Sequence, residues 1–426
     1  MNLELFKEEK TKAVLVSLNE NMTEQENISS LDELERLLDT AGGVAVARVT
    51  QNRTSPDKAT YIGSGKVKEL AEFISAYDGE IGLVVFDNEL SPSQIANLES
   101  ELDTRVIDRT MLILDIFAIH ATTGEGKLQV EIACLRYTAP RLMGQGLKLS
   151  RLGGGIGTRG PGESKLESDR RHIKRRIDAL KSELAELEKN RAVKRSARDK
   201  SGTMSAAIIG YTNAGKSTLL NYLTDAGILA EDKLFATLDP TTRRLTLPSG
   251  NEILLTDTVG FIDRLPTHLI KAFKSTLDEL RYADIIICLT DASEPDSERV
   301  KKRAVTEKLI EELGAKEKRL ITVYNKIDKV QEEEFIPNDS LRISAKNGTG
   351  IDSLLSELDE MVSCGKKVLK LFFPHAVRAK TADVYRHARV IGSEFIDDGV
   401  IITAECDRRA QGMFLEYAII GNNKKP

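Results

Sequence analysis

Four short segments in the second half of the chain carry residue types suited to binding a nucleotide. They are GYTNAGKS from Gly210, DTVG from Asp257, NKID from Asn325 and SAK from Ser344. Nucleoside triphosphatases usually contain a glycine-rich loop with lysine and serine, followed by an aspartate that binds a metal ion. The order and spacing of all four segments predict a switch protein that binds and hydrolyses GTP.

The first segment is a phosphate-binding loop. Its Gly210, Gly215, Lys216 and Ser217 fill the pattern G-x-x-x-x-G-K-S, and apolar residues on both sides predict a strand before the loop and a helix after it. In such a loop backbone N–H groups converge on phosphate oxygens, and the helix dipole favours negative charge. We expect Lys216 to reach the β and γ phosphates and Ser217 to ligate Mg²⁺.

The second segment follows the apolar run Ile253–Leu255, so Asp257 is expected at the end of a buried strand. There it would hold Mg²⁺ through a water molecule. Gly260 has no side chain, so its N–H can approach a γ phosphate. We therefore place Gly260 with Lys216 among the residues that act on the reacting phosphate.

Phe261 stands where many small GTPases carry a glutamine that positions the attacking water. We therefore expect slow unassisted hydrolysis, with the missing group supplied by a partner, by a backbone amide or by a bound cation. Two interpretations of Asn213 remain open. It is a ligand for a monovalent ion such as K⁺, or it caps a turn.

The third and fourth segments predict selection of guanine. The Asp328 carboxylate can accept from both donors on the guanine edge, while Asn325 and Lys326 brace the base and the phosphate loop. Adenine carries an amino group where guanine carries O6, so the backbone amides of Ser344 and Ala345 would favour guanine.

The segment LFATLDPTTRR, Leu234–Arg244, lies between the first two motifs, where a first switch loop belongs. Such loops order around GTP and Mg²⁺ and relax after hydrolysis. Thr237, Thr241 and Thr242 are all candidates for the hydroxyl that senses the metal, and spacing alone does not choose among them.

Composition limits the classes of protein that the chain can belong to. At 426 residues it is expected to hold roughly two to four domains. It has 41% hydrophobic and 30% charged residues, and no apolar run approaches the length of a membrane helix. The start MNLELFKEEKTK lacks a signal-peptide pattern, and the cysteines are widely spread. We expect a cytoplasmic protein that makes no membrane contact.

Positive charge is concentrated in one region. Residues 141–200 contain 17 Lys or Arg and 8 Asp or Glu, within a chain whose net charge is −5. Such a local excess indicates contact with a polyanion, most often phosphate. The alternative is a solvated helix surface.

The predicted fold class is α/β, with a doubly wound, mostly parallel P-loop GTPase domain. It is preceded by a small α/β domain and an antiparallel helical hairpin, and it is followed by a small α+β domain. The four domains are expected at residues 1–118, 119–200, 203–362 and 366–426.

The hairpin is expected to carry a flexible basic tip. One helix should run from near Thr122 to near Pro140, and the next should begin at Ser164. Between them Met143–Gly162 has eight glycines in 20 residues, with three basic and no acidic residues. We interpret it as a loop that orders on RNA, the alternative being a frayed linker. The predicted RNA contacts are Lys148, Arg151, Arg159, Arg170, Arg171 and Lys174.

The segment GQGLKLSRLGGGIGTRGPGESKLESDRR before the phosphate loop, together with FATLDPTTR and DTVGF, resembles the HflX family of bacterial ribosome-associated GTPases. The resemblance covers nearly the whole chain. It implies a cytoplasmic GTPase that binds the large ribosomal subunit and, in many bacteria, dissociates stalled or idle ribosomes under stress. It also implies that the hairpin tip enters the RNA of the peptidyl-transferase region, and we expect a monomer.

By the same resemblance Phe235–Asp239 becomes the nucleotide-sensing switch, and Thr237 supplies the second metal hydroxyl. The catalytic set is then Lys216, Thr237 and Gly260, and the metal set is Ser217, Thr237 and, through water, Asp257. The full set of expected nucleotide contacts is Gly210, Tyr211, Thr212, Asn213, Ala214, Gly215, Lys216, Ser217, Phe235, Ala236, Thr237, Leu238, Asp239, Asp257, Thr258, Val259, Gly260, Asn325, Lys326, Ile327, Asp328, Ser344, Ala345 and Lys346.

Two other functions fit the same residues. The GTPase could act as a ribosome-assembly factor on precursor RNA of the large subunit, or it could be a nucleotide-dependent protein scaffold without RNA contact. Sedimentation with ribosomes separates these possibilities.

Overall fold

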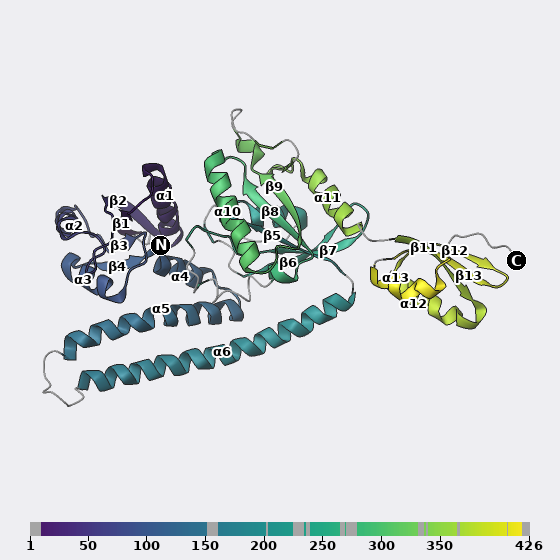
Figure 1. The fold of residues 1–426 in the computed structure, drawn as a ribbon, viewed down its shortest axis with the longest axis horizontal. Coiled ribbons are helices and arrows are strands. Elements are labelled where there is room, and N and C mark those ends of the chain that lie inside the picture. Colours follow the sequence, from purple (N-terminus) through teal and green to yellow (C-terminus); the bar gives the residue numbers. More distant parts are fainter. Residues whose placement is uncertain are drawn as a thin grey trace, which may run out of the picture.

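The computed structural model describes residues 10–150, 161–201, 203–224, 234–235, 239–264, 269, 279–330, 336–337, 340–363, 367–406 and 408–419. Figure 1 shows an N-terminal α/β unit and a small C-terminal unit on opposite sides of a central α/β unit, with a pair of long helices running below the first. This is the α/β fold class that the sequence predicts. In the described residues no helix is long and apolar enough to cross a membrane.

The N-terminal unit is a four-stranded parallel sheet with the order β2-β1-β3-β4. Each strand is followed by a helix, as right-handed crossovers between parallel strands require. The elements in chain order are β1 (Thr11–Asn19), α1 (Glu24–Thr40), β2 (Gly43–Asn52), α2 (Ser64–Ala76), β3 (Leu83–Phe86), α3 (Pro92–Leu102), β4 (Arg105–Asp108) and α4 (Arg109–His120). Helix α1 begins at a capping box in which the Thr23 hydroxyl accepts from the Glu26 amide.

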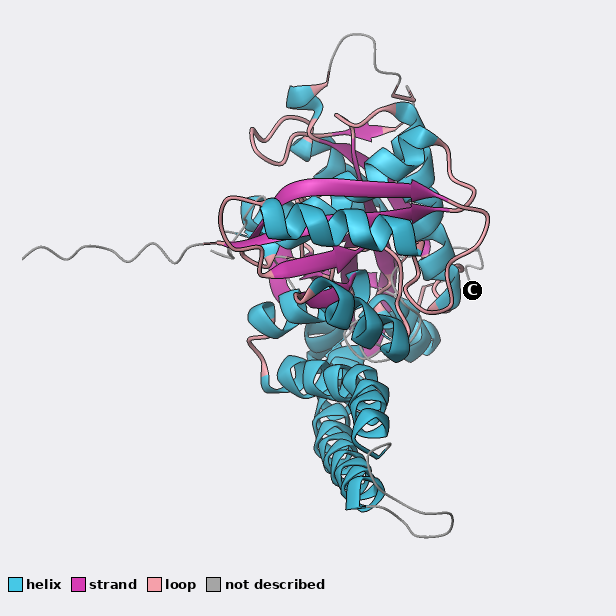
Figure 2. Cartoon of the chain, turned by 90° about the vertical axis from the view of Figure 1, so that its left-hand side faces the viewer, coloured by secondary structure: helices cyan, strands magenta, loops and turns pink. Residues whose placement is uncertain are grey.

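The two long helices are α5 (Gly124–Ser150) and α6 (Pro161–Ser201). They lie side by side, tied by an Arg176–Glu131 ion pair of 2.8 Å, and project from the body of the molecule (Figure 2). Such a pair is the antiparallel helical hairpin predicted from the sequence.

The predicted ends of these helices were wrong. Helix α5 passes through Pro140 and continues to Ser150, and α6 begins at Pro161 rather than Ser164. A proline inside a helix costs about 3 kcal/mol, but helix stability in proteins comes mainly from tertiary packing, which α5 finds along α6. The glycine-rich loop predicted over residues 143–162 is therefore helical at both ends, and residues 151–160 lie outside the described residues.

The central unit is a six-stranded sheet with the order β10-β9-β8-β5-β7-β6, parallel except for the edge strand β6. Its described elements are β5 (Ser205–Gly210), α7 (Lys216–Thr224), β6 (Thr241–Thr246), β7 (Glu252–Asp257), β8 (Ile285–Asp291), α10 (Asp296–Glu312), β9 (Arg319–Asn325), the 3₁₀ helix η1 (Ile327–Lys329), β10 (Leu341–Arg342) and α11 (Ile351–Ser363). Strands β5, β7 and β9 end at Gly210, Asp257 and Asn325, where three of the motifs begin, which brings these motifs to one edge of the sheet.

The C-terminal unit is an antiparallel sheet with the order β11-β13-β12, covered by short helices. It contains β11 (Lys367–Pro374), η2 (His375–Lys380), α12 (Thr381–His387), β12 (Arg389–Ile396), β13 (Gly399–Cys406), α13 (Arg408–Phe414) and η3 (Leu415–Tyr417). The sequence Ala379–Val390 has a helical pattern, but its last residues belong to β12. Pairing of Val390 with Ala404 of β13 outweighs the helical pattern there.

One apolar core joins the N-terminal and central units. It contains Leu34 and Phe117 from the first unit and Phe235, Val259 and Ile262 from the second, all buried. The two units therefore pack as one body at the edge of the sheet where the nucleotide motifs lie.

Candidate nucleotide-binding site

The phosphate loop spans the turn between β5 and α7. Gly210 and Gly215 have φ values of 153° and 94°, which glycine adopts without strain. A Cβ at Gly215 would lie 2.3 Å from Nδ2 of Asn325, so no larger residue fits. The loop is thus closed against the guanine-motif strand β9.

Lys216 is buried at the start of α7. Its Nζ donates to the backbone oxygen of Tyr211 at 2.9 Å and lies 3.3 Å from that of Gly210. Burial lowers the pKa of Lys216 to about 8, although Asp257 opposes this shift. Backbone oxygens beneath the loop therefore hold the ammonium group. Phosphate oxygens would give this buried positive charge a negative partner.

Ser217 and Asp257 meet at the end of β7. The Ser217 hydroxyl donates to Oδ2 of Asp257 at 2.6 Å, and Asp257 is fully buried. Both side chains offer only oxygen, the ligand that Mg²⁺ prefers. The donor set therefore fits the metal that GTPases generally use.

Gly260 lies against the phosphate loop. A Cβ at this position would lie 2.8 Å from Cγ2 of Thr212 and 2.9 Å from Nζ of Lys216. The preceding Thr258 is fixed by a 2.8 Å bond from its hydroxyl to the backbone oxygen of Ile208. The DTVG segment is thereby positioned directly beside the loop, as the sequence predicts.

The guanine motifs are connected through Asn325. Its Nδ2 donates to the backbone oxygen of Ala214 at 2.8 Å, and its Oδ1 accepts from the Ala345 amide at 2.9 Å. The Ser344 hydroxyl donates to Asp328 at 2.6 Å, which lowers the pKa of that carboxyl. Asp328 is exposed and ionised, ready to accept from a base.

The remaining members of these motifs lie beside them. Lys326 adopts a left-handed conformation with φ 66° and pairs with Asp291 at 2.7 Å. The Ile327 amide donates to the backbone oxygen of Ile343 at 3.2 Å, and Lys346 is exposed. All three thus lie where the structure brings the two guanine motifs together.

The switch segment turns toward the N-terminal unit. Phe235 packs edge-on against Phe117 with ring centroids 4.8 Å apart, and the Leu234 amide donates to the Thr40 hydroxyl at 3.2 Å. Ala236, Thr237 and Leu238 lie outside the described residues, so the role of Thr237 stays a prediction.

Asp239, the last residue of the predicted switch, binds the start of the hairpin. Its Oδ2 accepts from the Thr122 and Thr123 amides at 2.8 and 2.7 Å and from the Thr122 hydroxyl, while its Oδ1 accepts from the Thr123 hydroxyl. Burial would raise the pKa of Asp239, but hydrogen bonds from Thr123 and Thr122 outweigh it and lower that pKa. Asp239 thereby holds the two residues that precede helix α5, and the Thr123 hydroxyl caps that helix by accepting from the Gly126 amide.

Tyr211 of the phosphate loop also contacts the N-terminal unit. Its hydroxyl donates to Glu33 of α1 and accepts from the Asp263 amide at 2.6 Å. Glu33 in turn pairs with the buried Arg109, which lies 2.8 Å from Asp87. Sequence reasoning missed this network, because no local pattern pairs residues 178 positions apart.

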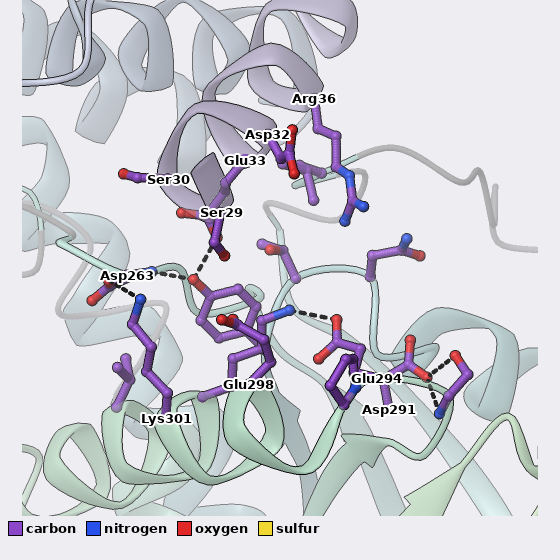
Figure 3. A pocket seen from close by; sticks show the side chains of 18 of the residues that line it. Ser29, Ser30, Asp32, Glu33, Arg36, Asp263, Asp291, Glu294, Glu298 and Lys301 are labelled. Atoms are coloured by element: carbon purple, nitrogen blue, oxygen red, sulfur yellow. Dashed lines mark hydrogen bonds and ion pairs between the residues drawn. The ribbon is translucent and has the colours of Figure 1, made fainter. Parts of the chain in front are cut away.

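A cavity of about 650 Å³ lies between α1, the phosphate loop and the start of α10. Figure 3 shows Arg36 and Asp32 on its α1 side and Asp291 and Glu294 on the opposite side. The buried Thr212 hydroxyl, which also lines it, has no hydrogen-bond partner among the described residues. A phosphate oxygen would satisfy that hydroxyl.

The expected RNA contacts are only partly described. Arg170, Arg171 and Lys174 are exposed on α6. The side chain of Lys148 is outside the description, as are Arg151 and Arg159 altogether.

The doubly wound sheet, with a phosphate loop after its central strand and guanine motifs after the neighbouring strands, defines a P-loop GTPase. Family comparisons agree. Residues 28–118 match the family described as GTP-binding GTPase N-terminal, residues 120–198 its middle region, and residues 205–326 a 50S ribosome-binding GTPase.

Relatives extend this match along the chain. The GTPase HflX of Lacrimispora saccharolytica is 50% identical over 403 residues, covering 94% of each chain. That of Caldanaerobacter subterraneus is 47% identical over 406 residues, 95% of this chain and 92% of its own. A solved GTP-binding protein from Sulfolobus solfataricus with GDP is 24% identical, with a TM-score of 0.45 over 83% of this chain and 99% of its own. The chain belongs to the HflX family of GTPases and is a GTP hydrolase.

Proposed function

We propose that this GTPase binds the large ribosomal subunit through the α5–α6 hairpin and dissociates stalled or idle ribosomes under stress. The observation that carries the proposal is the hairpin itself, which projects from the body, while Asp239 of the predicted switch binds the two residues before its first helix. The match of residues 205–326 to a 50S ribosome-binding GTPase family supports the same partner. The proposed place of action is the cytoplasm, and the acting form is a monomer.

In the proposed site Lys216 contacts the β and γ phosphates of GTP, and the Gly260 amide contacts the γ phosphate. Ser217 and Thr237 would hold Mg²⁺ directly, and Asp257 would hold it through water. When bound, the metal neutralises charge on the phosphate oxygens. The fit rests on the oxygen-only pair of Ser217 and Asp257, 2.6 Å apart, beside the buried ammonium of Lys216.

The hairpin offers positive charge where RNA phosphate would be met. Arg170 and Lys174 are four residues apart on α6, so they share one helix face, and Arg171 lies beside them. Arginine and lysine contacts to phosphate release counterions, which makes such binding favourable and salt-dependent. The basic segment of α6 is therefore the proposed RNA-contacting surface, together with the predicted tip residues.

GTP then acts as the switch for this surface. A ligand shifts a conformational equilibrium only as far as it binds one state better than the other. In our proposal GTP stabilises the state whose hairpin and N-terminal unit fit the large subunit, and splitting draws on the free energy of that binding. Hydrolysis removes this stabilisation, and the protein is then released from the large subunit.

Sedimentation with ribosomes tests the proposal. Intact ribosomes are incubated with the protein and GTP, GDP or a non-hydrolysable GTP analogue, and the particles are separated on a gradient. We expect association with the large subunit, and free subunits from intact ribosomes, in the GTP-like states. Association only with precursor particles would instead indicate an assembly factor, and no association would indicate a protein scaffold.

Charge reversal on the hairpin sharpens this test. The variant with Arg170, Arg171 and Lys174 all changed to Glu should lose ribosome association and retain GDP affinity. The control changes Lys127, Lys181 and Lys189 to Glu, three exposed cations elsewhere on the hairpin. Equal loss in both variants would show that net charge, and not this surface, drives binding.

A further inference from the structure

We propose that Arg36 of helix α1 contacts the phosphates of bound GTP and stabilises the negative charge that develops on them during hydrolysis. Phe261 leaves no side chain to position water at the place where many small GTPases carry a glutamine. A cationic group from another part of the chain is one way to compensate. This inference rests on GTP hydrolysis alone and is independent of ribosome binding.

The position of α1 directs Arg36 toward the phosphates. Glu33, Arg36 and Thr40 follow one another at spacings of three and four residues, so they lie on one face of the helix. Glu33 at one end of this stretch accepts from Tyr211 of the phosphate loop. Thr40 at the other end accepts from the Leu234 amide of the switch segment at 3.2 Å. Arg36 is therefore placed between the two segments that enclose a γ phosphate.

The lining of the cavity agrees with this direction of the Arg36 side chain. In Figure 3 the Arg36 side chain extends from α1 into the space over the phosphate loop. It lines the 650 Å³ cavity together with Thr212 and Asn213, and it lines the adjoining hollow with Asn213 and Leu234. The loop residue whose buried hydroxyl lacks a described partner, Thr212, thus borders the same space.

The positive charge of Arg36 is not engaged by the described acidic side chains around the cavity. Most acidic side chains around the cavity have a cationic partner: Asp32 pairs with Arg48, Glu33 with Arg109, Asp263 with Lys301, Asp291 with Lys326 and Glu294 with Lys302. Arg36 is exposed and makes no side-chain hydrogen bond or ion pair with any described residue. A triphosphate entering this acidic surrounding would supply the partner that Arg36 lacks.

The chemistry suits a guanidinium group. Hydrolysis forms a bond between a water oxygen and the γ phosphorus and breaks the bond from that phosphorus to the β–γ bridging oxygen. The electron pair of the broken bond leaves with GDP, and the water proton passes to the released phosphate. Arginine remains charged throughout and donates two parallel hydrogen bonds to phosphate oxygens, so it stabilises the charge without being consumed.

A potassium ion at Asn213 would compete for the same task. Asn213 borders the cavity beside Arg36, and its left-handed φ of 62° is one that asparagine tolerates in turns. We assign the cationic charge beside the loop to Arg36. The wild-type rate should then differ less than twofold between KCl and NaCl buffers.

Single-turnover hydrolysis of GTP by the full chain tests the assignment, with Arg36→Ala, Arg36→Lys and, as control, Lys68→Ala. Lys68 is an exposed cation on α2, away from the cavity. An arginine acting on the transition state contributes about 10³-fold or more in other GTPases, so we expect the rate to fall at least tenfold in Arg36→Ala. Arg36→Lys should keep part of the rate, and Lys68→Ala should match the wild type.

Binding measurements separate catalysis from simple affinity. In Arg36→Ala the affinity for GDP should stay within twofold of the wild type, while the affinity for GDP with aluminium fluoride, which resembles the transition state, falls at least tenfold. A rate within twofold of the wild type would overturn the proposal, as would equal losses of GDP and GDP–aluminium fluoride binding. A wild-type rate that requires K⁺, with no effect of Arg36→Ala, would assign the role to the cation at Asn213 instead.

Discussion

Gly260 shows how closely one residue is fitted to the phosphate loop. Only 2.8 Å separates the position of a Cβ at Gly260 from Cγ2 of Thr212, and 2.9 Å separates it from Nζ of Lys216. An added methyl group would push this segment away from the place where a γ phosphate must reach its amide. The same methyl group would leave the guanine side of the site untouched.

Gly260→Ala should therefore bind GDP within a few-fold of the wild type and hydrolyse GTP at least tenfold more slowly. Gly392→Ala serves as the control, because a Cβ there meets nothing within 4 Å. Nucleotide affinity and single-turnover rate are measured for both variants. Normal hydrolysis by Gly260→Ala would contradict the close approach seen in the structure.

Asp328 offers a test of base selection. Its carboxylate, held by a 2.6 Å bond from Ser344, can accept from two guanine donors, whereas an amide in its place accepts with oxygen and donates with nitrogen. Asp328→Asn should bind GTP at least tenfold more weakly and prefer xanthosine triphosphate, with competition binding as the measurement. Unchanged GTP affinity would refute the assigned role of Asp328.

At the residue scale, motif members could be predicted because their geometry is local. Gly215 and Lys216 occupy one turn, and the sequence around that turn is sufficient to place them. Glu33 and Arg36 could not be predicted, because their positions beside the loop depend on packing between units far apart in the chain.

Among the elements, α5 depends on an acidic residue from outside the hairpin. Helix α5 begins at Gly124, and Asp239 accepts the amides of the two residues before it, Thr122 and Thr123. The Thr123 hydroxyl also accepts from the Gly126 amide at 3.0 Å. The sequence predicts a start near Thr122 but gives no sign that a residue of the switch binds there.

Asp239→Ala should expose this first turn. Loss of a cap costs about 1 kcal/mol, so amide hydrogen exchange in residues 122–128 should become roughly fivefold faster. Asp398→Asn, an exposed change in the turn before β13, is the control. If exchange in α5 stays at the wild-type rate, the contact between switch and hairpin has no energetic weight and the proposed route from nucleotide to hairpin fails.

Strands were easier to predict than helix ends. Strands β5, β7 and β9 are short apolar runs buried in the sheet, and each ends where a motif begins. The extension of α5 beyond Pro140 reflects packing on α6, and the end of α12 reflects pairing in the C-terminal sheet. Both are tertiary effects that override local signals.

Over the whole molecule, the N-terminal unit contacts all three segments that are predicted to surround the phosphates. Glu33 binds Tyr211 of the phosphate loop, Phe117 packs on Phe235 of the switch, and Arg109 lies 3.4 Å from the backbone oxygen of Asp263 after DTVG. A change in any of these segments on nucleotide binding must alter its contact with that unit. By linkage, a partner that moves the N-terminal unit must alter nucleotide affinity in return.

Tyr211→Phe tests this coupling at the contact between the phosphate loop and helix α1. The change removes one hydroxyl that donates to Glu33 and accepts from the Asp263 amide, and it leaves Glu33 without that donor in a partly buried position. A hydrogen bond to a charged group contributes about 1.5–3 kcal/mol, so local opening of α1 should become at least tenfold more frequent. Tyr385→Phe, an exposed change in α12, is the control.

Hydrogen exchange of the full chain with and without GDP provides the measurement. In the wild type GDP should slow exchange in α1, because the loop that binds phosphate also holds Glu33. Tyr211→Phe should exchange faster in α1 and lose most of the GDP effect, while strands β11–β13 exchange alike in every sample and report that the fold is intact. If GDP protects α1 equally in Tyr211→Phe and in the wild type, this hydroxyl does not transmit the nucleotide state, and the coupling must run through Phe235 and Asp239 instead.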